Sequence, residues 1–480
     1  MSHSRTHTSP EAPTVFVIFG AFGDLSEQKL LPALFDLWQK KMLPKQFRIV
    51  GFSRRDARDA DVQAFASSAI AHKHKGKTPR GVAAFCAHLH YVHGIFEDPY
   101  AYERVAEALV AIDEQFGVCS NKLFYLAVPP NTYGTIFENL AHSGLTIPCG
   151  GNKGWTRILV EKPFGRDLAT AQKLDVTLGL LFKEEQIFRI DHYLAKENLQ
   201  NILAFRFSNA LFEPLWRKGY IEKVEVRLWE TAGIGRRGGF YEDIGALRDV
   251  GQNHMLQMLA LVAMDDPQTI DPSAIRAARA RALVALRPIH AAAMADHVVR
   301  GQYQSYRREA HVDADSRTET YVRIKAYVDN ERWSGVPFYL EAGKRMKENR
   351  VDITLFFKKA PSWIRALDAV AEVPANTLTF RIQPDEGIIL TFLAKRPGFG
   401  MALESKSLSF SYGSARGRTK SLEAYERILF DCIQGDQTLF ASTAEVAASW
   451  GYITPILTAW GNEQLHMYED GSLGPAGITK

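Results

Sequence analysis

The sequence predicts an α/β protein of two domains: a doubly wound domain with a parallel sheet over residues 14–190, and a larger α+β domain with a mostly antiparallel sheet over residues 191–480. Three observations support this. A chain of 480 residues is too long for one ordinary hydrophobic core. Strand and helix patterns alternate in its first part, and long helical patterns mix with alternating strand-like runs in the rest. Residues 1–13 are polar and are expected to form a disordered tail.

The first domain opens with Thr14–Phe19, a continuous apolar run rich in β-formers that is typical of a strand buried on both faces. The run stops at Gly20, and a helical pattern follows. Ser26 is placed to cap this helix, whereas Pro32 should bend it or delay its start. The apolar face of the helix comprises Leu30, Leu31, Leu34 and Leu37.

Three more strands are predicted at Phe47–Phe52, Lys122–Val128 and Arg157–Val160, with helical stretches such as Tyr102–Phe116 between them. Strands that alternate with helices are typical of a parallel sheet covered on both faces. The pattern therefore favours a Rossmann-like domain.

In the second domain a long helix is predicted over Leu247–Met264, and an arginine- and alanine-rich segment at 276–286 is expected to be a solvated helix. Alternating runs indicate an antiparallel sheet. These runs are Lys223–Trp229, Thr320–Val328, Asp352–Phe357 and Thr377–Ile382.

The composition is that of a soluble globular protein, with 46% hydrophobic and 23% charged residues. No stretch approaches the ~20 apolar residues of a membrane span, and residues 1–13 lack the apolar core of a secretory signal. A net charge of +4 without a basic tract argues against nucleic acid. We therefore expect a cytoplasmic protein with no membrane or nucleic-acid partner.

The four cysteines have no paired spacing, so neither a metal site nor a disulfide framework is expected, and a reducing compartment fits. They are Cys86, Cys119, Cys149 and Cys432.

The turn after the first strand resembles a nucleotide-binding turn. Gly20 and Gly23 match the second and third glycines of Gly-x-Gly-x-x-Gly, although Ile18 stands at the first position. Bare backbone at this point lets a pyrophosphate approach N–H groups at a helix N-terminus. The alternative is a tight turn with a purely structural role.

The end of the second strand distinguishes NAD from NADP, because NAD sites usually have an acid there and NADP sites an arginine. Ser53, Arg54 and Arg55 occupy this position. The sequence therefore favours NADP, with Arg54 as the main contact to the 2′-phosphate and Arg55 as a helper. The alternative is two surface arginines on a loop.

Residues 188–199 bring Asp191, His192, Tyr193 and Lys196 together in a few positions. Such a density of ionisable groups is unusual in a buried segment, whereas a phosphorylated ligand needs donors of this kind on one side of it. A solvated turn is the alternative.

In order and spacing, the motifs of this chain closely resemble those of the glucose-6-phosphate dehydrogenase family. The likeness runs from about Thr14 to the Trp333 region and Lys344. It rests on Gly-Ala-Phe-Gly-Asp-Leu at 20–25, Glu-Lys-Pro-Phe-Gly-Arg-Asp-Leu at 161–168, residues 188–199, Arg-Asp-Val-Gly-Gln-Asn-His at 248–254, and Gly-Val-Pro-Phe at 335–338 followed by Gly343-Lys344.

The resemblance implies oxidation of glucose 6-phosphate to 6-phosphoglucono-lactone with hydride transfer to NADP, the first step of the oxidative pentose phosphate pathway, in a homodimer or homotetramer. His254 is implied as the base that takes the C1 hydroxyl proton, since an unperturbed imidazole suits that work near neutral pH. Asp191 is implied to orient it and to stabilise the imidazolium. Without the flanking motif, His254 would be read as a core histidine.

The remaining roles are also implied by the resemblance. Substrate contacts are expected from Lys162, His192, Tyr193, Lys196, Glu230, Asp249, Lys344 and Arg350. Cofactor contacts are expected from Gly20, Gly23, Asp24, Leu25, Ser53, Arg54, Pro129, Tyr133 and Lys162.

Two positions depart from the family. Phe22 stands where a serine or threonine is usual, so a hydroxyl donor to the cofactor is lost. Asn349 stands where many members have a cation, and we expect the adjacent Arg350 to take over the phosphate contact. Two alternatives stay open: a dehydrogenase of the same fold with another hexose phosphate or with NAD, and a catalytically silent nucleotide-binding homologue.

Overall fold

The computed structural model describes residues 12–148, 154–359, 375–400, 402–411, 422–462 and 464–477. The tail expected at 1–13 therefore lies, apart from its last two residues, outside the described residues. The chain forms two compact units. The first comprises Met1–Gly165, Ala169–Ala195 and Leu422–Thr443, and the second Arg166–Leu168, Lys196–Ser421 and Ala444–Lys480.

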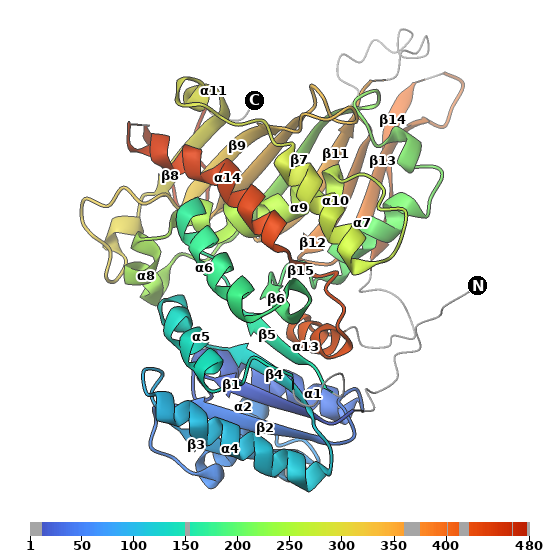
Figure 1. Cartoon of the computed structure of the whole chain (residues 1–480). Helices are drawn as coiled ribbons and strands as arrows, with labels where there is room; N and C mark the ends of the chain where they lie inside the picture. The colour runs from blue at the N-terminus through green and yellow to red at the C-terminus, as the bar shows by residue number, and fades with distance from the viewer. Residues whose placement is uncertain are drawn as a thin grey trace. The chain divides into compact units, whose positions relative to one another are not determined.

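The first unit contains a seven-stranded sheet in the order β15-β6-β5-β4-β1-β2-β3 (Figure 1). All neighbours run parallel except the short β15, which pairs antiparallel with β6. The strands are β1 (Thr14–Phe19), β2 (Phe47–Ser53), β3 (Leu89–His93), β4 (Asn121–Leu126), β5 (Thr156–Val160), β6 (Ile187–Ile190) and β15 (Phe440–Ala441). The Rossmann-like fold predicted from the sequence is confirmed.

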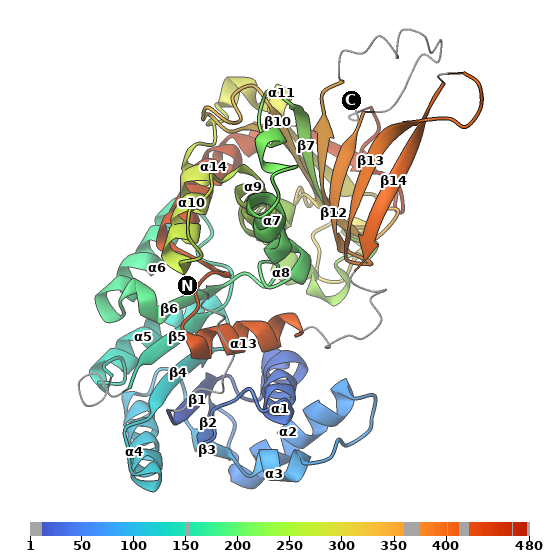
Figure 2. The same ribbon diagram turned by 90° about the vertical axis from the view of Figure 1, so that its right-hand side faces the viewer.

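Helices cover both faces of this sheet, with α4 and α5 on one side and α1 and α2 on the other (Figure 2). This explains the unbroken apolar runs, because every residue of β1 is buried. The helices are α1 (Leu31–Gln39), α2 (Asp59–Lys73), α3 (Val82–Cys86), α4 (Pro99–Phe116), α5 (Tyr133–His142), α6 (Leu168–Leu181) and α13 (Ala424–Gln434), with short helical turns at Pro130–Thr132 and Glu184–Gln186.

The segment Leu422–Thr443 belongs to the first unit although it comes late in the chain. Its strand β15 extends the parallel sheet next to β6, and Arg157 of β5 donates to the carbonyl of Cys432 at the end of α13. The sequence predicted one continuous second domain over residues 191–480, so the return of the chain to the first unit was not expected.

The helix after β1 differs in detail from the expectation. A π-helical turn, Ser26–Leu30, leads directly into α1, and Pro32 lies in the first turn of α1. Ser26 is not the cap: its hydroxyl donates to the carbonyl of Gly20 at 2.9 Å and so ties the helix to the preceding turn.

The second unit contains a nine-stranded sheet in the order β14-β13-β12-β11-β7-β10-β9-β8-β16. Neighbours are antiparallel except for the parallel pairs β7–β10 and β8–β16. The strands are β7 (Ile221–Trp229), β8 (Val298–Tyr303), β9 (Tyr321–Tyr327), β10 (Pro337–Gly343), β11 (Arg350–Phe357), β12 (Thr377–Gln383), β13 (Gly387–Lys395), β14 (Leu403–Ser411) and β16 (Leu465–Tyr468). The predicted mostly antiparallel sheet is confirmed.

Helices α7, α9 and α10 lie on one face of this sheet (Figures 1 and 2). The helical elements of the unit are α7 (Glu197–Phe207), α8 (Gly238–Glu242), a π-helical segment at Leu247–Met255, α9 (Leu256–Ala263), α10 (Pro272–Val284), α11 (Met294–His297) and α14 (Thr443–Ala459), with short turns at Glu213–Leu215, Gly235–Arg237, Ala291–Ala293, Tyr306–Arg308 and Trp460–Asn462. The predicted helix over Leu247–Met264 is therefore real but changes its winding at Leu256.

The expectation of a solvated helix at 276–286 is wrong. The segment is part of α10, but Arg276 and Arg279 are buried, and the Nε of Arg279 lies 2.7 Å from Oε1 of the fully buried Glu445. An ion pair makes the burial of both charges possible.

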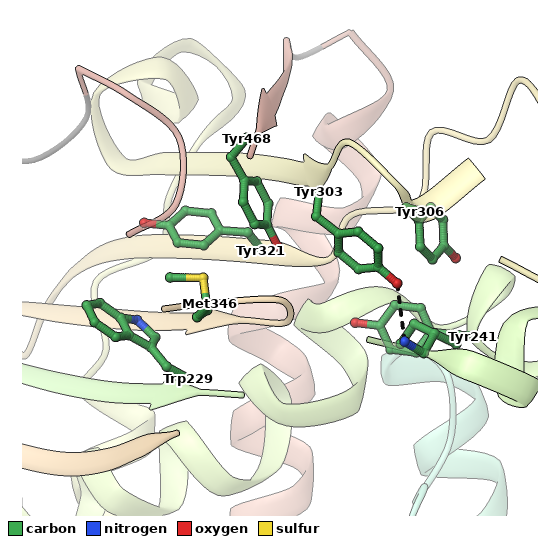
Figure 3. Close-up of a cluster of buried hydrophobic side chains, with 8 residues drawn as sticks. Trp229, Tyr241, Tyr303, Tyr306, Tyr321, Met346 and Tyr468 are labelled. Atoms are coloured by element: carbon green, nitrogen blue, oxygen red, sulfur yellow. Dashed lines mark hydrogen bonds between the residues drawn. The ribbon is translucent and has the colours of Figure 1, made fainter. Parts of the chain in front are cut away.

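An aromatic cluster supports the strand ends of β7 and β10 (Figure 3). Trp229 is the last residue of β7, and Met346 follows β10. The buried members of the cluster are Trp229, Ile234, Tyr241, Tyr303, Tyr306, Tyr321, Met346 and Tyr468. Dense aromatic packing gives the adjacent loops a rigid base.

The expectation that no cysteine pairs is wrong, since Cys119 is disulfide-bonded, while Cys86 and Cys432 are free thiols. Cysteine spacing in the sequence carried no sign of this bond; Cys149 lies outside the described residues. Within the described ranges, no helix has both the length and the apolar character that a membrane crossing requires.

Candidate active site

A pocket of about 500 Å³ opens at the carboxyl ends of β1, β2 and β4 in the first unit. Dinucleotides bind at this edge of doubly wound sheets, where the strand order reverses. The lining comprises Gly20, Phe22, Gly23, Ser53, Arg54, Arg55, Ile95, Phe96, Glu97, Ala127, Val128, Pro129 and Thr132.

Gly20 allows the close approach that this turn requires. Its φ is +84°, and a Cβ there would lie 2.4 Å from the carbonyl oxygen of Ala127. The N–H of Gly23 donates to the carbonyl of Gly20 at 2.9 Å, which closes the turn. The need for glycine at this position thus has a direct steric cause within the protein itself.

Ser53, Arg54 and Arg55 lie together at the end of β2, and all three line the pocket. Ser53 is buried, whereas both arginines are exposed. Glu97 lines the same pocket, but no carboxylate lies within ion-pair distance of either guanidinium in the described part of the chain. Two cations without a counter-ion suit a doubly charged phosphate.

Pro129 also lines this pocket, whereas the remaining predicted cofactor residues lie outside its lining. Asp24 is exposed and Leu25 half-buried at the start of the following helix. Tyr133 is buried, and its hydroxyl donates to the carbonyl of Glu161 at 3.1 Å. Its place in a cofactor site stays a prediction.

Lys162 follows β5 next to an acidic group that the sequence prediction did not single out. The neighbouring Glu161 carboxylate accepts hydrogen bonds from the hydroxyls of Tyr125, at 2.5 Å, and Tyr425, at 3.2 Å. Burial raises the pKa of Glu161, while the two tyrosine hydroxyls and the Lys162 charge oppose that rise. These bonds fix the backbone that carries Lys162.

Asp191, His192 and Tyr193 form the turn that leaves β6. The N–H of Tyr193 donates to Oδ1 of the buried Asp191 at 3.0 Å, and the rings of His192 and Tyr193 are 5.0 Å apart. The turn therefore holds the aspartate rigidly and presents two half-buried side chains. Lys196 belongs to the second unit, where it immediately precedes α7.

Asp249 and His254 lie in the π-helical segment Leu247–Met255. His254 is buried, with 1% of its surface exposed, and its backbone N–H donates to Oδ1 of Asn253 at 2.6 Å. The amide of Asn253 in turn donates to the carbonyl of Asp249 at 2.9 Å. Irregular helical winding of this kind is frequent at functional sites, because it re-aims side chains.

Glu230, Asp249 and Lys344 come together in the second unit. The Nζ of Lys344 lies 2.6 Å from Oε2 of Glu230 and 3.7 Å from Oδ2 of Asp249. Glu230 follows β7 and Lys344 follows β10, and these strands are parallel neighbours. The structure thus unites three of the predicted substrate residues. The contact could not be predicted, because the three residues are far apart in the sequence.

Tyr241 belongs to this cluster but was not predicted. It is 1% exposed, its ring centroid lies 5.6 Å from the Nζ of Lys344, and its hydroxyl has no hydrogen-bond partner among the described residues. Burial and the charge of Asp249 raise its pKa well above the usual value. Tyr241 lies in the short helix α8, and no motif in the sequence pointed to it.

Asn349 and Arg350 occupy distinct places next to this cluster. The Oδ1 of the exposed Asn349 accepts from the N–H of Thr231 at 2.8 Å. Arg350 begins β11 and binds the carboxylate of the fully buried Asp352, with Glu348 at 3.5 Å. Arg350 therefore already has a structural partner, and its phosphate contact stays a prediction.

Comparisons with known proteins agree along the whole chain. Residues 17–201 match the model of the glucose-6-phosphate dehydrogenase NAD binding domain, and residues 203–480 match that of the glucose-6-phosphate dehydrogenase C-terminal domain. Glucose-6-phosphate 1-dehydrogenase 2 of Mycobacterium bovis is 39% identical, over 96% of this chain and 91% of its own. Glucose-6-phosphate 1-dehydrogenase of Chlamydia pneumoniae is 40% identical, over 96% of this chain and 93% of its own.

Solved structures give the same result. A glucose-6-phosphate dehydrogenase in complex with its substrate glucose-6-phosphate matches with a TM-score of 0.90 and 33% identity, over 98% of this chain and 97% of the other. Glucose-6-phosphate 1-dehydrogenase from Mycobacterium avium matches with a TM-score of 0.83 and 32% identity, over 97% of this chain and 96% of the other. The chain therefore belongs to the glucose-6-phosphate dehydrogenase family.

Proposed function

We propose that this chain oxidises glucose 6-phosphate at C1 to 6-phosphoglucono-lactone and uses NADP as hydride acceptor, the step that opens the oxidative pentose phosphate pathway. The observation that carries the proposal is the Glu230–Asp249–Lys344 cluster, in a chain that belongs to this family. Asp249 precedes the buried His254 by five positions in the sequence. Carboxylates and an ammonium suit the hydroxyls of a sugar.

In the proposed reaction, the imidazole of His254 takes the proton of the C1 hydroxyl as the C1–H bond releases its hydride. The nicotinamide, when bound, supplies the hydride acceptor. Asp191 would orient the imidazole and stabilise the imidazolium. Its rigid turn after β6, with Oδ1 held by the N–H of Tyr193, supports such a fixed role.

For the substrate phosphate we propose His192, Tyr193 and Lys196, helped by Lys162. For the sugar hydroxyls we propose Glu230, Asp249 and Lys344. The 2.6 Å ion pair between Lys344 and Glu230 offsets the charge of the lysine, which suits it to a neutral hydroxyl better than to a phosphate dianion.

For the cofactor we propose NADP over NAD, bound in the pocket at the ends of β1, β2 and β4, with Arg54 on the 2′-phosphate. The absence of an acid at the end of β2 supports this preference. A homodimer or homotetramer and a cytoplasmic location also stay predictions.

A steady-state assay tests the proposal. Formation of reduced nicotinamide is measured with glucose 6-phosphate, other hexose phosphates and free glucose, each with NADP and NAD. The proposal requires the highest kcat/KM with glucose 6-phosphate and NADP. Faster turnover of another sugar phosphate, or a preference for NAD, would assign a different dehydrogenase activity. Nucleotide binding without turnover would identify a silent homologue.

A further inference from the structure

Phe22, which takes the place of a hydroxyl in the nucleotide turn, contacts an arginine. The Cζ of Arg55 lies 4.6 Å from the centroid of the Phe22 ring, within the range of a cation–π contact. The ring itself is fixed from two other sides, by Phe65 at 5.1 Å and Tyr91 at 5.4 Å between centroids. Phe22 is thus an anchored aromatic surface beneath a guanidinium.

The main chain of Arg55 is fixed as well. The hydroxyl oxygen of Tyr91 lies 2.5 Å from the carbonyl oxygen of Arg55 and 2.8 Å from that of Ser53, so its one proton is shared between the two acceptors. Tyr91 lies in β3, the strand next to β2. Two contacts from opposite ends of the residue therefore define where the Arg55 side chain lies.

The charge of Arg55 has no counter-ion within ion-pair distance among the described residues. Phe22, Arg54 and Arg55 all line the same pocket of about 500 Å³. The guanidinium of Arg55 thus rests on the Phe22 ring, next to that of Arg54, at a pocket. This arrangement suits an anionic ligand better than a structural ion pair.

We propose that Phe22 is the platform that holds Arg55 as the second cation of a 2′-phosphate clamp, with Arg54 as the first. This inference rests on the proposed use of NADP. The lost hydroxyl at position 22 is thereby replaced by charge-assisted hydrogen bonds, which are roughly twice as strong as neutral ones. Arg55 becomes a residue that determines coenzyme specificity.

The test measures the contribution of the 2′-phosphate without turnover. Calorimetry on the full chain gives Kd for adenosine 2′,5′-bisphosphate and for 5′-AMP, and the Kd of 5′-AMP divided by the Kd of the bisphosphate reports the 2′-phosphate alone. Arg55→Ala should reduce that ratio by about tenfold or more, since a charged hydrogen bond is lost. Phe22→Leu, which keeps an apolar side chain but removes the ring, should reduce it about threefold. In the Arg55→Ala background, Phe22→Leu should have no further effect.

Two outcomes would overturn the inference. Equal losses of affinity for both nucleotides in Arg55→Ala would show that Arg55 contacts the adenine or only stabilises the fold. Independent, additive effects of Phe22→Leu and Arg55→Ala would show that the ring does not act through the guanidinium. Thermal melts of each variant control for folding.

Arg54→Ala separates this inference from the proposed cofactor. If Arg54→Ala abolishes the preference for the 2′-phosphate and Arg55→Ala does not, the NADP proposal stands and the clamp fails. If the wild-type chain binds both nucleotides equally, the NADP proposal itself fails.

Discussion

The Nζ of Lys344 lies 2.6 Å from Oε2 of Glu230, although the two residues are 114 positions apart in the sequence. The pairing of β7 with β10 creates this contact: the strands run parallel, and the N–H of Glu230 donates to the carbonyl of Gly343 at 2.9 Å. Both residues thus lie at the same end of the sheet, directly after the carboxyl ends of β7 and β10. The position of the ammonium is set by the fold before any substrate arrives.

Lys344→Met should raise the KM for glucose 6-phosphate by about tenfold or more and leave the KM for NADP unchanged, because a charged hydrogen-bond donor to the sugar is lost. Glu230→Gln should have a smaller effect, since the amide still holds the ammonium through its oxygen. Steady-state kinetics of both variants check this expectation. An unchanged KM in Lys344→Met would remove Lys344 from the substrate site.

His254→Asn should lower kcat by roughly a hundredfold or more and leave substrate binding nearly intact, because the base acts in the transition state. Asp191→Asn should lower kcat less, since the base survives but loses its orienting charge. The measurements are kcat and the Kd for glucose 6-phosphate. Near-normal kcat in His254→Asn would contradict the assignment of the base.

Arg350→Ala should destabilise the fold by on the order of 3 kcal/mol, because the fully buried Asp352 loses its cation. Arg350→Lys keeps a charge beside Asp352 and should retain most of the stability. If Arg350 also serves the substrate phosphate, the lysine variant should still raise the KM for glucose 6-phosphate, and Asn349→Arg should bring little gain. An unchanged KM in Arg350→Lys would leave Arg350 with a structural role alone.

Stability should fall between about pH 4 and about pH 7 because of Asp431. Burial raises the pKa of this carboxyl from 3.8 to about 7, against the opposing charge of Arg427. The folded state therefore keeps a proton that the unfolded chain releases near pH 4, and rising pH favours unfolding by up to about 4 kcal/mol. Asp431→Asn should lack this fall. Urea unfolding at about pH 5 and about pH 8 measures it, and identical pH profiles would count against the raised pKa.

Tyr241→Phe should stabilise the protein by about 1 kcal/mol, since it removes a buried hydroxyl that has no partner among the described residues. The ring, which packs beneath Lys344, stays in place. A thermal melt of the variant checks the sign. A clear loss of stability would mean that the hydroxyl is satisfied in the folded protein.

The parallel strands could be predicted because burial on both faces leaves a continuous apolar run, as in Thr14–Phe19. Strands with one exposed face were missed where polar residues interrupt the pattern, as in β3 and in β14, whose middle residues are exposed. The solvated helix at 276–286 was a wrong prediction because Arg279 pairs with Glu445, 166 positions away. No local pattern carries that contact.

In the candidate site, too, local motifs were predictable and tertiary contacts were not. Gly20 and Arg54 were predictable because each directly follows a parallel strand, and the carboxyl ends of these strands meet at the pocket. Motifs also named Glu230, Asp249 and Lys344, but their mutual contact depends on strand pairing. The contacts of Phe22 with Arg55 and of Tyr241 with Lys344 are tertiary and could not be anticipated.

The proposed reaction transfers the C1 hydride of glucose 6-phosphate to NADP. Glucose 6-phosphate deuterated at C1 tests it most directly, with mass spectrometry of both products. Hydride transfer from C1 requires reduced coenzyme that carries the deuterium and a lactone, or its hydrolysed acid, that carries none. Reduced coenzyme without deuterium, or no reduced coenzyme at all, would contradict it.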